Sequence, residues 1–256
     1  MDDATFLASY DPAAFPPLAV AVDVVPLTFT NGALCVLLNK RTELPARGRL
    51  ALPGTFVRAD EELGAAAQRA LRDKAGLDAP VRQFHAFGAV ARDPRMRIVS
   101  IGYMAVVDAE IMGRASAPLG TCELLPISGG VLRTAAGRRT SLPFDHDAIL
   151  ARALADLRRD LDRDDWAFGL LPECFSLREL QALHEAIRGR AEDAATYRQQ
   201  LARTERRGGA AHDLSIDNRH VADADDAHAR VTRDSAKGVE LAHRRIKASL
   251  VTQRAL

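Results

Sequence analysis

The sequence predicts an α+β protein in which a sheet-forming N-terminal part precedes a mostly helical C-terminal part. Strand-like apolar runs surround one clear amphipathic helix within residues 18–131, and this mixture is typical of α+β folds. Near residues 142–144 the strand pattern fades, and helical periodicity takes over from Asp145. A chain of 256 residues with 47% hydrophobic content can bury a sizeable core in one or two domains.

The first strands are predicted from two apolar runs and the turn between them. Residues 18–25 are almost continuously apolar, which is typical of a strand covered on both faces, and residues 1–16 before them are expected to be an irregular lead-in. An Asn31-Gly32 pair separates this run from a second one at residues 34–39. Two apolar runs joined by Asn-Gly predict a β-hairpin. Further strands are predicted at residues 81–90, 98–107 and, more weakly, 124–131.

Residues 52–77 form the stretch around which the N-terminal part is organised. Pro53-Gly54 predicts a turn, and the acidic residues 60–62 are expected in the first turn of a helix, where the helix dipole favours carboxylates. Gly76 follows the last apolar position of the helix and fits a C-cap. The apolar face of this predicted helix consists of Leu63, Ala66, Ala67, Ala70 and Leu71.

The C-terminal part predicts a succession of capped helices. Asp145 or Asp147 can cap the first helix, and residues 166–171 predict a short apolar strand. Ser176 and Glu179 then have the spacing of a capping box, which opens a helix that ends at Gly189. Asp193 caps a further helix, with Tyr197 and Leu201 facing inward. This order is the layout of a winged helix-turn-helix.

The helix after Asp193 has a polar outer face that is suited to DNA. A recognition helix must present hydrogen-bond donors to phosphates and base edges, and the alternative is a merely solvated polar face. The expected DNA contacts are Thr196, Arg198, Gln199 and Arg203. A wing is not evident, because residues 210–235 are rich in Ala, Asp and His and residues 214–216 are their only strand-like piece.

Composition also limits the possible partners, cysteine chemistry and location of the protein. The net charge of +1 neither requires nor excludes a nucleic-acid partner. The three cysteines lack metal-type spacing and fit buried thiols in a reducing compartment. The N-terminus has acids where a signal peptide has bases, and no apolar run is long enough to span a membrane. We therefore expect a soluble cytoplasmic protein without a membrane partner.

The layout of residues 52–77 resembles the Nudix box, G-x5-E-x7-R-E-U-x-E-E-x-G-U, in which U is aliphatic. Alignment without a gap places the glycine of the box at Thr55, its glutamate at Glu61, its arginine at Arg69 and its final pair at residues 76–77. The R-E-U-x-E-E core corresponds to residues 69–74, which read Arg-Ala-Leu-Arg-Asp-Lys.

The chemistry of the box is degenerate. In the family, the core glutamates hold the divalent metals that activate water against a pyrophosphate. Ala70 offers no oxygen ligand to a hard cation such as Mg²⁺, and Lys74 brings a positive charge to a ligand position. Glu61 and Asp73 are the residual box acids and the only weak candidates for metal ligands. The resemblance therefore implies a Nudix fold that has kept a binding pocket and lost its catalytic carboxylates, with no required cofactor.

Two more segments resemble one branch of the family. Residues 92–103, RDPRMRIVSIGY, match a DPR-x-R-x-x-S-x-x-Y segment, and residues 171–177, LPECFSL, match a join to a helix-turn-helix. The branch is that of the Nudix-related transcriptional regulators of NAD metabolism. Membership implies a Nudix-type α/β/α sandwich that senses ADP-ribose or a related nucleotide, followed by a winged helix-turn-helix that binds double-stranded DNA, in a dimeric repressor. The implied parts are a Nudix-like domain at residues 1–142, the winged domain at 143–225 and a helical or disordered tail at 226–256.

The resemblance also suggests which residues contact the nucleotide. Guanidinium groups match the geometry of phosphates, and an aromatic ring can stack on adenine. The alternatives are a solvated arginine-rich turn and an ordinary core phenylalanine. The expected ligand contacts are Arg49, Phe56, Arg58, Arg92, Arg95 and Arg97.

Two other functions stay open at this point. A working hydrolase of the ADP-ribose type would use Glu61 and Asp73, with Asp60 or Glu62, as residual Mg²⁺ ligands. A sensor or scaffold would bind the nucleotide but would have lost DNA binding through its altered wing. The Glu61–Arg69 pair itself is expected to be a structural salt bridge rather than a catalytic pair.

Overall fold

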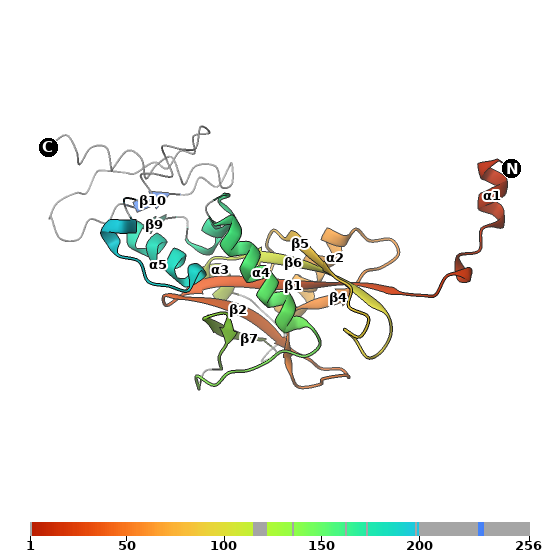
Figure 1. The fold of residues 1–256 in the computed structure, drawn as a ribbon, viewed down its shortest axis with the longest axis horizontal. Helices are drawn as coiled ribbons and strands as arrows, with labels where there is room; N and C mark the ends of the chain where they lie inside the picture. The colour runs from red at the N-terminus through yellow and green to blue at the C-terminus, as the bar shows by residue number, and fades with distance from the viewer. Residues whose placement is uncertain are drawn as a thin grey trace.

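The computed structural model describes residues 2–114, 122–134, 136–161, 163–172, 174–197, 199 and 230–232 (Figure 1). The strands are β1 (Ala19–Thr30), β2 (Ala33–Lys40), β3 (Leu50–Ala51), β4 (Gly54–Phe56), β5 (Arg82–Phe87), β6 (Ile98–Val106), β7 (Cys122–Ser128), β8 (Val131–Leu132), β9 (Cys174–Ser176) and β10 (Arg230–Thr232). The helices are α1 (Asp3–Ser9), α2 (Leu63–Ala75), α3 (Ala109–Gly113), α4 (His146–Asp160) and α5 (Leu177–Arg188), with 3₁₀ turns η1 (Pro12–Ala14) and η2 (Trp166–Leu170).

One mixed sheet organises the molecule, with strand order β5-β6-β1-β2-β7-β8. β1 lies at its centre, antiparallel to β2 and parallel to β6. Residues 22–28 of β1 are all buried, which confirms the prediction of a strand covered on both faces. The predicted hairpin is also confirmed, because Asn31 and Gly32 adopt φ values of 52° and 73°, as a two-residue turn of this kind requires.

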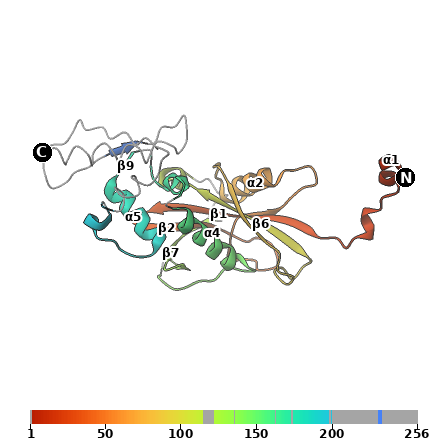
Figure 2. The same cartoon turned by 45° about the horizontal axis from the view of Figure 1, so that its top comes forward.

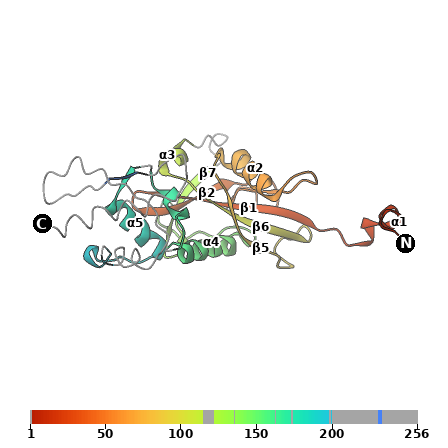
Figure 3. The same ribbon diagram turned by 90° about the horizontal axis from the view of Figure 1, so that it is seen from above.

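Helices cover both faces of the sheet (Figures 2 and 3). Along β1 the side chains alternate between two cores, because successive residues of a strand point to opposite faces. Val22 and Val24 pack with α2, whereas Val25 and Leu27 pack with α4. The expected α+β organisation, with a helix layer on either side of a sheet, is therefore confirmed.

Three local predictions were wrong. Residues 1–16 contain α1 and η1, because the side chains of Asp2 and Asp11 cap these turns. Helix α2 starts at Leu63 with Glu62 as its N-cap residue, so residues 60–62 lie before the first turn, and Glu61 instead binds Arg69. Residues 166–170 form a 3₁₀ turn rather than a strand.

The C-terminal part is mostly helical where the structure describes it. The capping box of Ser176 and Glu179 is present, and α5 ends at Gly189 in the left-handed conformation, as predicted. Asp193 accepts hydrogen bonds from the backbone and hydroxyl of Thr196, and Tyr197 is buried. The strand-like piece at residues 214–216 lies outside the described residues.

A small antiparallel pair, β9 with β10, adjoins α5. The sequence did not predict a strand at residues 230–232. The proposed domain boundary at residues 142 and 143 stays a prediction, and α4, just after it, shares one core with both the sheet and α5. No helix among the described residues is long and apolar enough to cross a membrane.

Candidate functional site

A cleft of about 190 Å³ opens where β1, the end of β2, β4, the loop after β5 and the start of α4 meet. Both charge signs and two aromatic rings face it. Its charged, aromatic and histidine lining consists of Asp23, Arg41, Glu43, Phe56, Lys74, Arg92, Asp93, Arg95, Phe144 and His146. Residues from six separate regions of the sequence thus converge on one site.

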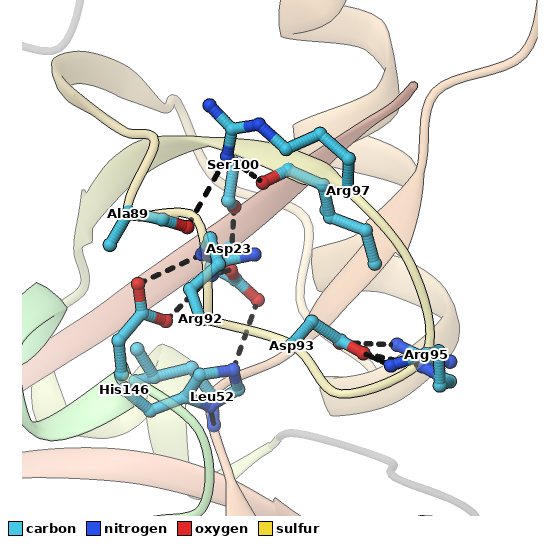
Figure 4. A network of polar contacts seen from close by, with 11 residues as sticks. Asp23, Leu52, Ala89, Arg92, Asp93, Arg95, Arg97, Ser100 and His146 are labelled. Carbon is cyan, nitrogen blue, oxygen red and sulfur yellow. Dashed lines mark hydrogen bonds and ion pairs between the residues drawn. The ribbon is translucent and has the colours of Figure 1, made fainter. Parts of the chain in front are cut away.

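The floor of the cleft is a buried polar network centred on Asp23 of β1 (Figure 4). Its Oδ2 atom accepts hydrogen bonds from the Ser100 hydroxyl at 2.6 Å and from Arg92 Nη2 at 3.2 Å. A buried carboxylate is tolerated only when it is paired and hydrogen-bonded. Gly54 lies against it, and a Cβ atom at this glycine would come within 2.3 Å of Asp23 Oδ1. The buried network therefore requires glycine at residue 54, in the turn that precedes the box.

Arg92 joins this floor to α4. Its Nε and Nη2 atoms donate to the two carboxylate oxygens of Asp145, at 2.8 and 2.7 Å, and its side chain is 4% exposed. Burial alone lowers the pKa of Arg92, but the carboxylates of Asp145 and Asp23 raise it above its ordinary value. Asp145 occupies the N-cap position of α4 without capping it through its side chain, which corrects the expected role. Its carboxylate instead accepts two hydrogen bonds from Arg92.

His146, the first residue of α4, is held neutral in the same network. Its Nδ1 atom accepts a hydrogen bond from the Leu52 backbone at 3.0 Å, so the proton lies on Nε2, 3.4 Å from Asp23 Oδ1. Burial lowers the pKa of His146, although the Asp23 and Asp145 carboxylates oppose this. Both ring nitrogens of His146 therefore face partners within the protein.

Two aromatic rings and two guanidinium groups form the mouth of the cleft. Asp93 holds Arg95 through two side-chain hydrogen bonds of 2.9 and 2.8 Å. The Arg95 guanidinium then lies 5.4 Å from the Phe56 ring centre and 6.0 Å from that of Phe144. Arg41 lies 5.0 Å from the centre of the Phe144 ring. Such cation–π contacts orient the cations without neutralising them.

Not all of the arginines expected at the site reach it. Arg92, Arg95 and Phe56 line the cleft, whereas Arg49, Arg58 and Arg97 do not. Arg97 donates to the backbone oxygen of Ala89, and Arg49 donates to that of Ser141. The cleft also contains residues that sequence reasoning did not select, namely Asp23, Arg41, Phe144 and His146. An isolated acid within the apolar run of β1 was the available signal for Asp23.

The residual box acids lie away from the cleft lining. Glu61 is held by Arg69, whose Nε and Nη2 atoms donate to its two carboxylate oxygens at 2.7 Å each. The Arg69 hydrogen bonds lower the pKa of Glu61 to about 2. Arg69 also donates to Thr55 and to the Phe56 carbonyl, and so ties α2 to β4. The prediction that the Glu61–Arg69 pair is a structural salt bridge is supported by this geometry.

The divalent ion that the resemblance to the Nudix box implies does not fit the residues present. Ala70 is buried in the core under α2, and neither Glu61 nor Asp73 lines the cleft, but Lys74 does. Divalent ions of this kind require several oxygen ligands. Within the described part of the chain, no group of three or more His, Cys, Asp and Glu side chains could hold a metal.

The residues expected to contact DNA are only partly described. Thr196 and Gln199 are exposed, although the Thr196 hydroxyl donates to Asp193. The side chains of Arg198 and Arg203 lie outside the described residues. Contact between these four residues and DNA stays a prediction.

Comparisons with known proteins identify the family. The NUDIX domain family matches residues 17–140. The NUDIX domain of Shewanella oneidensis NrtR complexed with ADP ribose is 30% identical, with a TM-score of 0.51 over 61% of this chain and 99% of that chain. The chain belongs to the Nudix family. Its degenerate box at residues 69–74 therefore lies on a true Nudix fold.

Two further relatives extend beyond the Nudix domain. The ADPR responsive transcriptional repressor NtrR of Acinetobacter baylyi is 29% identical over 199 residues, which cover 77% of each chain. Shewanella oneidensis NrtR complexed with a 27mer DNA is 24% identical, with a TM-score of 0.67 over 83% of this chain and 92% of that chain. The latter match establishes similarity of fold across most of this Nudix-family chain.

Proposed function

We propose that this Nudix-family protein is a nucleotide-responsive transcriptional repressor. Its cleft binds ADP-ribose or a closely related nucleoside diphosphate, and its C-terminal helical part, a winged helix-turn-helix, binds double-stranded DNA. One observation carries this proposal: the similarity to the repressor NtrR runs over 199 residues, well beyond the matched Nudix domain at residues 17–140. A similarity confined to a hydrolase domain would not extend into the capped helices after residue 145.

The chemistry of the cleft favours binding over hydrolysis. Glu61 is engaged by Arg69, and Lys74 occupies a position where the family uses a metal-binding carboxylate. The cleft keeps two aromatic rings and several cations, which are the groups that recognise a base and phosphates. We therefore propose that the protein releases or retains DNA according to nucleotide occupancy and does not cleave the nucleotide.

The position of α4 supports communication between the two parts. His146 at its start, with Phe144 just before it, lines the cleft, and near its other end Arg158 donates a 2.6 Å hydrogen bond to the Ile187 carbonyl of α5. A ligand shifts an equilibrium only through different affinities for two states. A rigid-body displacement of α4 relative to the sheet would create two states of the cleft. The nucleotide would bind these two states with different affinities.

We also propose that the protein acts as a homodimer. The N-terminal arm, residues 2–18, projects from the body of the molecule (Figure 1). Its exposed large apolar side chains are Phe6, Leu7, Tyr10, Phe15 and Leu18. A helix of seven residues is not stable by itself in water, so it needs a surface to pack against. We propose that a second copy of the chain provides this surface.

A gel-shift experiment tests the proposed function. Genomic fragments that flank the gene are mixed with the protein at moderate salt, with and without ADP-ribose. The expected result is a specific shift that changes with ADP-ribose and weakens steeply as salt rises, because phosphate contacts release counterions. The absence of any specific shift would refute DNA binding. Release of phosphate-containing products from ADP-ribose in the presence of Mg²⁺ would support the hydrolase instead.

A further inference from the structure

The last turn of the box helix places a cation at the cleft. Lys74 belongs to α2 and lines the cleft together with Thr55 and Phe56 of β4. Its position corresponds to the final glutamate of the R-E-U-x-E-E core. The substitution therefore reverses the sign of the charge at a position where the family binds metal. Its location at the cleft makes this reversal relevant to any ligand bound there.

Two of the three other cations of the cleft are already paired with carboxylates, whereas the third, Arg41, donates a hydrogen bond to the Pro45 carbonyl. Arg92 is bound by the carboxylates of Asp145 and Asp23, and Arg95 by that of Asp93. The ammonium group of Lys74, by contrast, has no hydrogen bond and no acidic partner in the part of the chain that the structure describes. Its backbone carbonyl accepts a hydrogen bond from the Cys122 thiol at 3.1 Å. Lys74 can thus turn its full charge toward an anion.

A nucleoside diphosphate needs positive charge where its two phosphates lie. Nudix proteins with a complete box obtain it from divalent ions held by the box carboxylates. That source does not fit here, since Ala70 has no ligand atom and Glu61 is bound through both oxygens to Arg69. An ammonium group provides a compact point charge with three hydrogen-bond donors, which suits phosphate oxygens.

We infer that Lys74 replaces the divalent cation in this cleft, so that the protein binds the diphosphate of its nucleotide without metal. Lys74 is a binding residue in this assignment and has no part in catalysis. The inference rests on the proposed function, because it concerns the same cleft and the same class of ligand. It further distinguishes this chain from a hydrolase that has merely lost activity, since such a protein would still need Mg²⁺ to hold the nucleotide.

Calorimetric titration of the full-length protein with ADP-ribose tests the inference. The wild type is titrated in buffer with EDTA and in buffer with MgCl₂, and equal affinities are expected. Lys74→Gln removes the charge but keeps a polar chain of similar length. It should weaken binding in EDTA about tenfold or more, which is the usual effect of losing one charge-assisted hydrogen bond. Lys74→Arg should keep most of the affinity, because it restores a cation.

Arg72→Gln is the matched control. Arg72 is on the same helix two residues earlier, has the same charge, and pairs with Asp78 away from the cleft. Its replacement should leave ADP-ribose affinity within about twofold of wild type, as expected of an exposed pair. Thermal unfolding of each variant by circular dichroism verifies that all of them fold.

The outcomes separate this inference from the proposed function. Binding by the wild type only in MgCl₂, or unchanged binding by Lys74→Gln, overturns the role of Lys74 and leaves the nucleotide as the ligand. An absence of ADP-ribose binding in both buffers removes the proposed ligand and the Lys74 assignment together. Equal wild-type affinities with selective weakening by Lys74→Gln support both.

Discussion

At the scale of single residues, the cleft depends on close approach between a carboxylate and a glycine. Asp23 lies in the central strand, 6% exposed, and its oxygens are shared among Ser100, Arg92 and His146. Gly54 faces it across the β1–β4 pairing, where Asp23 and Gly54 are register partners. Any side chain at residue 54 must displace part of this buried network.

Gly54→Ala is expected to destabilise the protein. The added Cβ atom would approach Asp23 Oδ1 at 2.3 Å and the Val22 carbonyl at 2.9 Å. Overpacking of this kind costs about 1–3 kcal/mol of the free energy of unfolding. Gly64→Ala is the control, because Gly64 has open space around it within α2, where alanine is favoured over glycine by about 0.5–1 kcal/mol. Urea denaturation should show opposite signs for the two variants, and equal signs would contradict the argument.

Glu61→Gln gives a prediction that depends on pH. The pKa of Glu61 is lowered from 4.5 to about 2 in the folded protein, mainly by the Arg69 hydrogen bonds. The stabilisation by a carboxylate with a lowered pKa is fully present above the unfolded pKa and is lost as pH falls through the folded pKa. The Tm difference between wild type and Glu61→Gln should therefore be largest at neutral pH and shrink between about pH 4.5 and pH 2.

The control for the Glu61 experiment is Glu110→Gln. Glu110 pairs with Arg114 on α3, and both side chains are 73% exposed. Exposed pairs of this kind contribute little to stability, so its Tm should follow that of wild type at every pH. A Tm difference for Glu61→Gln that does not change with pH would rule out ionisation of Glu61 as its cause.

At the scale of elements, α4 has contacts with both functional regions. Its 15 residues span about 22 Å at 1.5 Å per residue. At one end, Asp145 and His146 belong to the polar network of the cleft, and near the other end Arg158 hydrogen-bonds to α5. Between them, Ile149, Leu150 and Leu154 are buried in the core shared with the sheet.

Arg158→Ala is expected to uncouple the nucleotide from DNA. Without the 2.6 Å bond to the Ile187 carbonyl, movement of α4 is passed less tightly to α5. ADP-ribose affinity should stay near the wild-type value, while the change in DNA affinity caused by ADP-ribose should fall severalfold toward one. Arg152→Ala, on the same helix but paired among the described residues with Asp156 alone, is the control. Fluorescence anisotropy of labelled DNA with and without ADP-ribose measures this ratio, and an unaltered ratio would exclude α4–α5 contact as the route.

At the scale of the whole molecule, the N-terminal arm is notable because all of its residues, 2–18, are exposed. Its side chains contact one another, with ring centres of Tyr10 5.8 Å from Phe6 and 6.1 Å from Phe15, yet all of them are exposed. α1 contains no buried residue. Exposed apolar groups gathered in one segment are typical of an interaction surface.

Deletion of residues 2–17 is expected to convert a dimer into a monomer. The deletion removes four of the five exposed apolar side chains of the arm and leaves β1 and its partners intact. Light scattering after size-exclusion chromatography should show a fall from about twice the chain mass of 27.7 kDa to the mass of one shortened chain. A dimer that persists after deletion would place the interface elsewhere, and a monomeric wild type would refute the proposed dimer.

Much of the fold follows from local sequence patterns. The central strand, the Asn31-Gly32 hairpin, the left-handed glycines at the ends of α2 and α5 and the capping box of Ser176 were all predicted correctly. These features are determined by residues only a few positions apart, so they can be predicted from the local sequence. The errors at residues 60–62 and 166–170 have the opposite origin. Glu61 lies before the helix start and accepts a hydrogen bond from Arg69, which is eight residues later in the sequence.

The sequence by itself determined the family and the loss of its catalytic carboxylates, because both depend on the identity and spacing of residues 52–77 and 92–103. Only the tertiary structure decided which cations of the cleft are paired with carboxylates. Arg92 is neutralised by Asp23 and Asp145, which are 69 and 53 residues away, whereas Lys74 keeps an unpaired charge within the described residues. The electrostatics of a site depend on distances in space, and these distances exist only once the sheet and its helices have assembled.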